Sequence, residues 1–283
     1  MCLFALLGRW AGALGSACAV AGGFVAANYL FKTPGWTDGR VLPWKQVNES
    51  KPWEWLPRAA LVLILVGLAS RWLGLLLARV LPERRWWAAN LFVWAPRVAA
   101  VVAVSGWLVS ERWAAEHSWL PWALPVVMML NWVVLDTVSR SGSGAEVAAY
   151  LSVNAMAVGA VLLYMDWAAV TEVAVMLGAA LFGVTVAAWL AKTDASGAIP
   201  AAVAFLPALM VAGRTSAIGS VPLASFWLLA LAPLTLSPFL IPRLAKHDGW
   251  KTRTARAVLI LIPVLIALVL ADQNAKLSFG DDW

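Results

Sequence analysis

Residues 173–191 read VAVMLGAALFGVTVAAWLA, a run of nineteen residues without a charged side chain. In an α-helix, at a rise of about 1.5 Å per residue, this run is about long enough to cross the hydrocarbon core of a bilayer. Uncharged runs of the same length cover residues 147–165 and 195–213. A transmembrane β-barrel would instead show segments of about ten residues with alternating hydrophobicity. The pattern therefore predicts transmembrane helices.

The composition of the whole chain supports the same fold class. Of its 283 residues, 62% are hydrophobic and 13% are charged, whereas a soluble domain carries about 25% charged residues. The net charge of +6 comes from Lys and Arg placed between apolar runs, as orientation signals are, and not from a nucleic-acid-binding patch. We therefore expect one integral membrane domain over residues 1–283, in contact with the lipid bilayer and with no nucleic-acid partner.

Charged residues mark the ends of the predicted spans, and the runs between them give an all-α polytopic transmembrane bundle of about nine helices. Eight or ten spans are the alternatives, because the first and last runs are the weakest. The first run is also compatible with a cleaved signal peptide, but residues 1–8 lack the usual positive charge, which favours a retained helix. The predicted runs are residues 10–31, 59–80, 88–110, 118–138, 147–165, 173–191, 195–213, about 222–242, and 257–271.

The distribution of Lys and Arg predicts the orientation. With nine spans, eleven basic residues lie on the side of the N-terminus, eight on the other side, and two inside spans. Because basic residues concentrate on the cytoplasmic side, we expect a multi-pass protein of the cell membrane with a cytoplasmic N-terminus and an external C-terminus. Five of the eight basic residues on the other side fall in one loop, residues 32–58, and these oppose the prediction.

The predicted external loop at residues 32–58 is rich in tryptophan, with Trp36, Trp44, Trp53 and Trp55 among prolines and charges. Tryptophan is favoured where membrane meets water, because its ring is apolar and its N–H group seeks water or head groups. The loop is therefore interpreted as part of an interfacial belt. The alternative is a cap that binds a ligand or a protein partner.

Residue types that catalysis needs are scarce inside the predicted spans. The two histidines, His117 and His247, fall in loops, which disfavours a His-ligated metal or a Ser–His nucleophile at depth. Intramembrane prenyltransferases hold magnesium with paired aspartate-rich motifs. Here Asn131 and Asp136 are one residue too far apart for such a motif, and Arg140 stands where a second aspartate is required. An enzyme is therefore the third-ranked class of function, and we expect no metal and no cofactor.

Several polar side chains are predicted to lie at one depth, about 12–15 Å from the cytoplasmic edge. They are Arg71, Arg97, Asn131, Asn154 and Thr235. Because a guanidinium group binds phosphate or carboxylate through two hydrogen bonds, the two arginines predict a site for an anionic group. The alternative is a structural role, in which the arginines reach outward to lipid head groups while their polar neighbours form hydrogen bonds between helices.

A polar stripe extends this prediction along one helix. Glu146, Tyr150 and Asn154 are spaced four residues apart, so they share one helix face, which we expect to line a cavity open to the cytoplasm. The predicted ligand-binding residues are Arg71, Arg97, Asn131, Asn154 and Tyr150. The favoured function is a transporter or flippase that takes an anionic solute or lipid head group from the cytoplasmic side. The alternative is a structural or accessory subunit of a membrane complex.

Overall fold

The computed structural model describes nearly all of the predicted spans and little of the long loop between the first two. The described residues are 11–23, 56–80, 86–109, 118–141, 144–165, 168–216, 221–241, 244 and 249–279. Within these ranges all regular structure is helical, which confirms the all-α fold class. The tryptophan-rich loop lies outside them, except for residues 56–58, which form the first turn of a helix.

Within the described ranges, eight α-helices and two 3₁₀ segments follow a short N-terminal helix at Ala11–Gly23. The α-helices are α2 (Leu56–Val80), α3 (Trp86–Leu108), α5 (Leu120–Ser141), α6 (Gly144–Leu163), α7 (Ala168–Ala191), α8 (Ile199–Ser216), α9 (Leu223–Leu231) and α11 (Trp250–Phe279). The 3₁₀ segments are η3 (Ser196–Ala198), directly before α8, and η4 (Ala232–Leu240), which continues α9.

Seven helical segments in the described part of the chain are long and apolar enough to cross a membrane. They are α2, α3, α5, α6, α7, α9 together with η4, and α11. In the described residues of the other two predicted spans, the apolar helices are shorter, Ala11–Gly23 and Ser196–Val211. The helical membrane fold is therefore supported, whereas the predicted count of nine spans is not confirmed.

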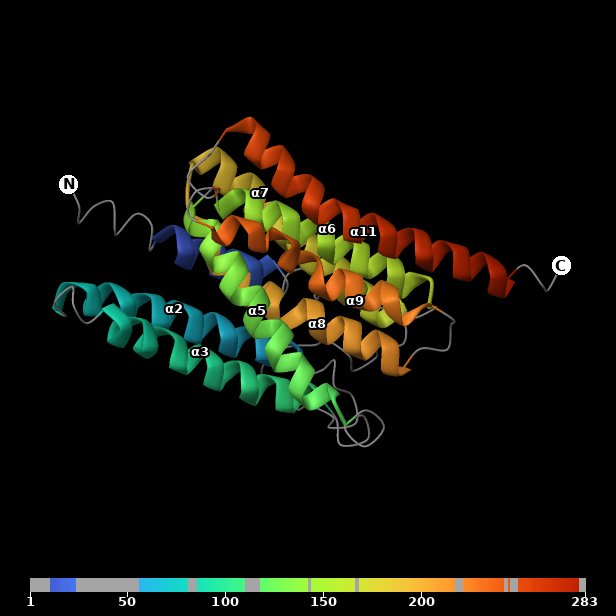
Figure 1. Ribbon diagram of the computed structural model, residues 1–283, viewed down its shortest axis with the longest axis horizontal. Helices are drawn as coiled ribbons and strands as arrows, with labels where there is room; N and C mark the ends of the chain where they lie inside the picture. Colours follow the sequence, from blue (N-terminus) through green and yellow to red (C-terminus); the bar gives the residue numbers. More distant parts are fainter. Residues whose placement is uncertain are drawn as a thin grey trace.

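The helices run roughly along one direction and form a bundle (Figure 1). Helices α2 and α3 pack together as a pair along one side, and α6, α7 and α11 form the opposite side. Helix α8 lies between them and contacts α2, α5, α6, α7 and α9. Residues 199–210 are buried without interruption, and a helix that is apolar on all sides is typical of such a central position.

The outer faces of the bundle carry large apolar side chains. Trp122, Trp189, Leu190 and Phe182 are all exposed. Extensive exposed apolar surface is rare on soluble monomers. Lipid contact explains it, because hydrocarbon rather than water then surrounds these side chains.

Glycines allow the N-terminal helix to pack closely against the segment before α8. A Cβ atom on Gly197 would overlap the carbonyl oxygen of Ala13, and one on Gly12 would lie 2.8 Å from the backbone nitrogen of Asp194. A third glycine, Gly144 at the start of α6, approaches the same segment: its Cβ would lie 2.7 Å from the nitrogen of Ala195. The Asp194–Ser196 turn is thus enclosed from two sides.

Candidate functional site

A cleft with a volume of about 540 Å³ lies at one end of the bundle, where the C-terminal ends of α5 and α7 meet the N-terminal ends of α6 and α11. Of the described residues that line it, four have basic side chains and one has an acidic side chain. The lining residues are Arg71, Ser139, Arg140, Gly144, Ala188, Trp189, Lys192, Thr193, Asp194 and Arg253. The cleft is therefore strongly cationic.

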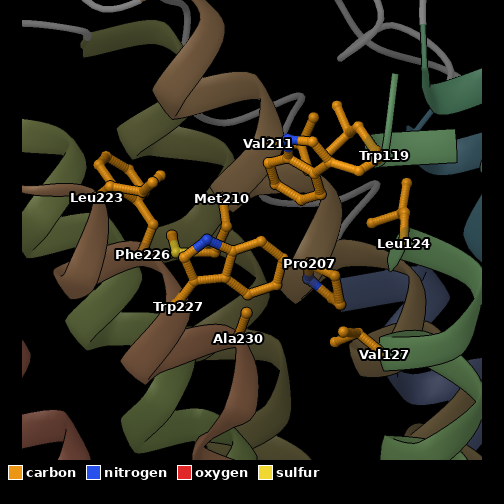
Figure 2. A pocket seen from close by; sticks show the side chains of 11 residues that line it. Trp119, Leu124, Val127, Pro207, Met210, Val211, Leu223, Phe226, Trp227 and Ala230 are labelled. Atoms are coloured by element: carbon orange, nitrogen blue, oxygen red, sulfur yellow. The ribbon is translucent and has the colours of Figure 1, made fainter. Parts of the chain in front are cut away.

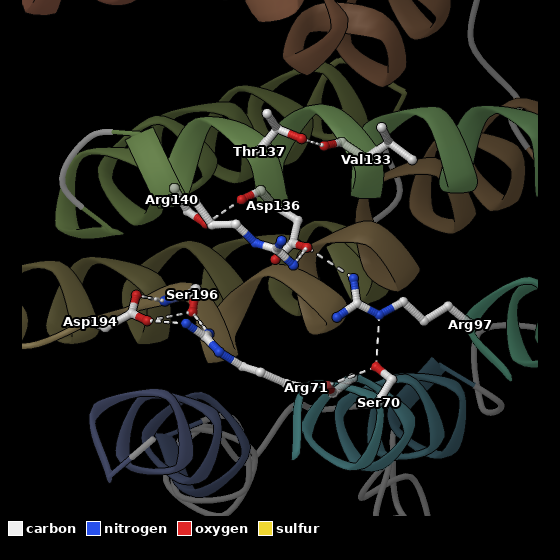
Figure 3. Close-up of polar contacts among 11 residues, drawn as sticks. Ser70, Arg71, Arg97, Val133, Asp136, Thr137, Arg140, Asp194 and Ser196 are labelled. Atoms are coloured by element: carbon white, nitrogen blue, oxygen red, sulfur yellow. Dashed lines mark hydrogen bonds and ion pairs between the residues drawn. The ribbon is translucent and has the colours of Figure 1, made fainter. Parts of the chain in front are cut away.

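Arg71, one of the two predicted arginines, lines this cleft and pairs with Asp194, the acidic residue among its described lining (Figure 3). Arg71 Nη2 lies 2.6 Å from Asp194 Oδ2, and Arg71 Nη1 donates to Ser196 Oγ. Asp194 also accepts the backbone N–H of Ser196 at 2.9 Å. Acidic residues are favoured at such a position, because the first N–H groups of a helix need acceptors and carry partial positive charge. Asp194 therefore offers little uncompensated negative charge to the cleft.

Lys192 enters the cleft from an unusual backbone conformation. It follows the last residue of α7 with a φ of 51°, in the left-handed region. The N–H of Thr193 bonds to the carbonyl of Ala188 at 3.0 Å, which is the hydrogen bond of a Schellman motif. Glycine is preferred at this position, and another residue costs about 1–3 kcal/mol, a strain that tends to occur at functional sites.

Arg97, the other predicted arginine, is not among the residues that line the cleft and lies deeper in the protein (Figure 3). Its side chain is only 2% exposed. Arg97 Nε donates to Ser70 Oγ at 2.7 Å, and Arg97 Nη1 lies 3.0 Å from Asp136 Oδ2. The same carboxylate oxygen lies 2.7 Å from Nη2 of Arg140, which is 60% exposed and does line the cleft. Asp136 therefore joins a buried arginine to a cleft-lining one.

Aromatic rings complete the surroundings of Arg97. Its guanidinium carbon lies 4.6 Å from the ring centre of Trp94 and 5.2 Å from that of Trp132. Both distances suit cation–π attraction, which strengthens when water is excluded. Arg97 thus does not reach the surface, as the snorkelling alternative required.

Glu146 on α6 repeats the arrangement of Asp136 with two arginines of α11. Glu146 Oε1 lies 2.9 Å from Nε of Arg253, which lines the cleft, and Glu146 Oε2 lies 3.5 Å from Nη1 of the fully buried Arg256. Tyr150, one turn further along α6, donates its hydroxyl hydrogen to the carbonyl oxygen of Arg253 at 3.2 Å. The predicted stripe on α6 therefore begins beside the cleft, but Glu146 and Tyr150 pack against α11.

The two predicted asparagines lie together at the junction of α9 and η4. Asn154 Nδ2 donates to the carbonyl of Leu229 at 3.1 Å, and Asn131 Nδ2 donates to the carbonyl of Ala230 at 3.0 Å. Pro233 has no N–H group for the carbonyl of Leu229 four residues earlier, and this carbonyl accepts the N–H of Ala232 instead. The amides supply hydrogen bonds where the proline interrupts the helix, as membrane helices require. The structure thus gives these asparagines partners away from the cleft.

From the sequence, Arg71 was predicted to bind the ligand, whereas Arg140, Lys192 and Arg253 were interpreted only as orientation signals. Their positions in the sequence could have identified them as neighbours. Each of these residues lies near the end of a predicted span on one side of the membrane, and Asp136 precedes Arg140 by one helical turn. Charges that gather at the ends of successive antiparallel helices converge in space.

A second, apolar pocket of about 190 Å³ lies near the N-terminal ends of α5 and α9, away from the cleft (Figure 2). Its lining contains no charged side chain. Trp119 and Trp227 face it with ring centres 5.5 Å apart, next to Met210 and Phe226. Within the described ranges no group of three His, Cys, Asp or Glu residues could hold a metal ion.

Comparison with known proteins gives no relative for this chain: no family model, no curated protein and no solved structure matches it. The class of protein therefore follows from the fold alone. The chain is an all-helical protein with seven helices in its described residues that are long and apolar enough to cross a membrane.

Proposed function

We propose that this protein is a multi-pass transporter or flippase that binds an anionic group, either a free anionic solute or the phosphate of a lipid head group, in its cationic cleft. The observation that carries the proposal is the lining of the cleft, with Arg71, Arg140, Lys192 and Arg253 against the single carboxylate of Asp194. A cleft of one charge sign between low-dielectric walls concentrates ions of the opposite sign.

The charges behind the lining support the proposal. Among the described residues, the cleft lining, the carboxylates that pair with it and the arginines that pair with those carboxylates contain six basic and three acidic side chains, an excess of three positive charges. The basic ones are Arg71, Arg97, Arg140, Lys192, Arg253 and Arg256, and the acidic ones are Asp136, Glu146 and Asp194. Every one of the three carboxylates already pairs with an arginine. An anion that enters the cleft therefore meets cations that the protein has not neutralised.

The rim of the cleft favours a lipid head group over a free solute as the source of the anion. Trp189 lines the cleft and is 73% exposed, and its neighbour Leu190 is also exposed. Tryptophan at such a place is suited to the head-group layer of a membrane. A lipid whose phosphate enters the cleft could keep its acyl chains against this apolar surface.

The excess of Lys and Arg on the side of the N-terminus supports a cleft that opens to the cytoplasm in the cell membrane. The alternative role, an accessory subunit that recruits a partner through residues 32–58, depends on residues outside those that the structure describes. A protein partner recovered in stoichiometric amount would support this alternative.

Ligand-dependent thermal unfolding tests the proposal. The protein is reconstituted in phosphatidylcholine nanodiscs with and without phosphatidylglycerol, or with added inorganic phosphate, and unfolding is followed by the fluorescence of its 19 tryptophans. A ligand near saturation should raise the melting temperature by on the order of 5 °C. A response to phosphatidylglycerol alone indicates a lipid head group, and a response to free phosphate indicates a solute.

Matched variants assign the effect to the cleft. The double change Arg140→Gln and Lys192→Gln should abolish the anion-dependent rise, because it removes two of the four lining cations. Lys251→Gln provides the control, since Lys251 is exposed near the start of α11 but does not line the cleft. An equal rise in the wild type and the double variant would refute the proposal.

A further inference from the structure

Arg256 is the least satisfied charged side chain among those that the structure describes. It is 0% exposed, and its Nε, Nη1 and Nη2 atoms make no hydrogen bond to any described residue. Arg97 is almost as deeply buried, yet it bonds to both Ser70 and Asp136. A buried guanidinium without hydrogen bonds is costly, because its hydration is lost without replacement. Arg256 therefore needs an anionic partner that fits it better than its present surroundings do.

The nearest anion is the carboxylate of Glu146, which lies between two guanidinium groups. Arg253 Nε forms an ion pair with Glu146 Oε1 at 2.9 Å, whereas Arg256 Nη1 stays 3.5 Å from Oε2. The ring of Phe239 packs 4.9 Å from the guanidinium carbon of Arg256. The carboxylate thus pairs closely with the cleft-lining arginine and only loosely with the buried one.

Two arginines that converge on one anionic group form the arrangement with which proteins bind phosphate. Arg253 is 52% exposed and lines the cleft, so an anion can reach this side of the pair. Glu146 remains partly exposed, and Arg256 lies behind it. Phosphate has more oxygen atoms than a carboxylate and can bond both guanidinium groups at once.

We propose that Glu146 is a tethered substitute for the ligand: its carboxylate holds the position between Arg253 and Arg256, and an incoming phosphate or phosphate-bearing head group displaces it. This inference rests on the proposed anion-binding function of the cleft and extends it by an inner binding station. Displacement of Glu146 gives Arg256 the hydrogen-bonded partner that it lacks. The anion then lies between α6 and α11, beside η4.

The competing interpretation is that Glu146 and Arg256 are a structural ion pair that holds α6 against α11. The two interpretations predict different effects on anion affinity when the charge of Glu146 is removed. If Glu146 competes with the ligand, removal of its charge tightens anion binding. If the pair is only structural, the same change loosens the site or leaves the affinity unchanged.

The test is a titration of the purified full-length protein with inorganic phosphate, and with phosphatidylglycerol in nanodiscs, read as the shift in melting temperature. In Glu146→Gln the concentration that gives half of the shift should fall by about tenfold. In Arg256→Gln, both alone and combined with Glu146→Gln, this concentration should not fall below that of the wild type. Arg256→Lys keeps the charge but loses the two-pronged geometry. Combined with Glu146→Gln, it should show only part of the tightening that Glu146→Gln alone shows.

Glu172→Gln is the matched control, because Glu172 is a half-buried carboxylate near the start of α7, away from the cleft. If Glu146→Gln fails to fold, Glu146→Asp keeps the charge but shortens the side chain, and it should tighten binding to a smaller extent. An unchanged or weakened affinity in the Glu146 variant that folds would overturn the inference. In that case, if Arg140→Gln with Lys192→Gln still abolishes the wild-type response, the cleft proposal stands and only the inference about Glu146 fails.

Discussion

Arg97 shows what an arginine inside a membrane bundle needs in order to be stable. It has a carboxylate in Asp136, a hydroxyl in Ser70 and two indole rings around its guanidinium group. The sequence identified Arg97 and Arg71 as unusual because they interrupt apolar runs. It did not identify their partners, since Asp136 lies 39 residues from Arg97 and Asp194 lies 123 residues from Arg71. Such pairs are set by how the helices pack, which local periodicity does not encode.

The Arg97–Asp136 pair gives a prediction at the residue scale. Asp136→Ala alone should lower the free energy of unfolding by about 3–5 kcal/mol, because Arg97 is left buried without its counter-charge. Combining it with Arg97→Met should restore part of this loss, since the double variant carries no unpaired buried charge. Chemical denaturation in detergent measures the difference. Losses that simply add in the double variant would contradict the coupling of the two residues.

At the scale of elements, the apolar runs predicted most helices within a few residues: residues 59–80 correspond to α2 (Leu56–Val80), and residues 118–138 to α5 (Leu120–Ser141). The number of spans was harder to predict. Helix α8 is apolar because other helices enclose it, and an apolar run alone does not distinguish a helix surrounded by protein from one that faces lipid. The break between α9 and η4 was also not predicted, although Pro233 stands beside it.

The contact between the N-terminal helix and η3 is tested by a pair of glycine variants. Gly197→Ala should destabilise the protein by about 1–3 kcal/mol, because its Cβ would overlap the carbonyl of Ala13. Gly183→Ala on α7 is the control: nothing lies within 4 Å of its Cβ, so its effect should stay within about 1 kcal/mol. Melting curves of both variants measure this. Equal stability would show that the N-terminal helix does not pack as closely as described.

At the scale of the whole molecule, the cationic cleft and the apolar pocket lie at opposite ends of the bundle. The cationic cleft lies where α5 ends and α11 begins, and the apolar pocket lies where α5 and α9 begin. Helix α11 runs from the cleft end to the far end of the bundle (Figure 1). Lys192 and the C-terminal end of α11 therefore lie toward opposite ends, however many of the shorter helices cross the membrane.

Topology reporters test this arrangement together with the charge-based orientation. A reporter fused after Lys192 should be active in the cytoplasm, and one fused after Trp283 should be active outside. The first result follows from the excess of basic residues on that side, and the second from the direction of α11. Two reporters on the same side would contradict the described path of the chain. Exchanged sides would contradict only the proposed orientation.

The anion-binding cleft is tested most directly by the melting temperature in phosphatidylglycerol nanodiscs compared with phosphatidylcholine nanodiscs, measured for the wild type and for Arg140→Gln with Lys192→Gln. The expected result is a rise on the order of 5 °C in the wild type and in Lys251→Gln, and none in the double variant. If inorganic phosphate produces the rise instead, the ligand is a solute and the cleft is still its site. No rise with either anion in the wild type, or the same rise in the double variant, would contradict anion binding in the cleft.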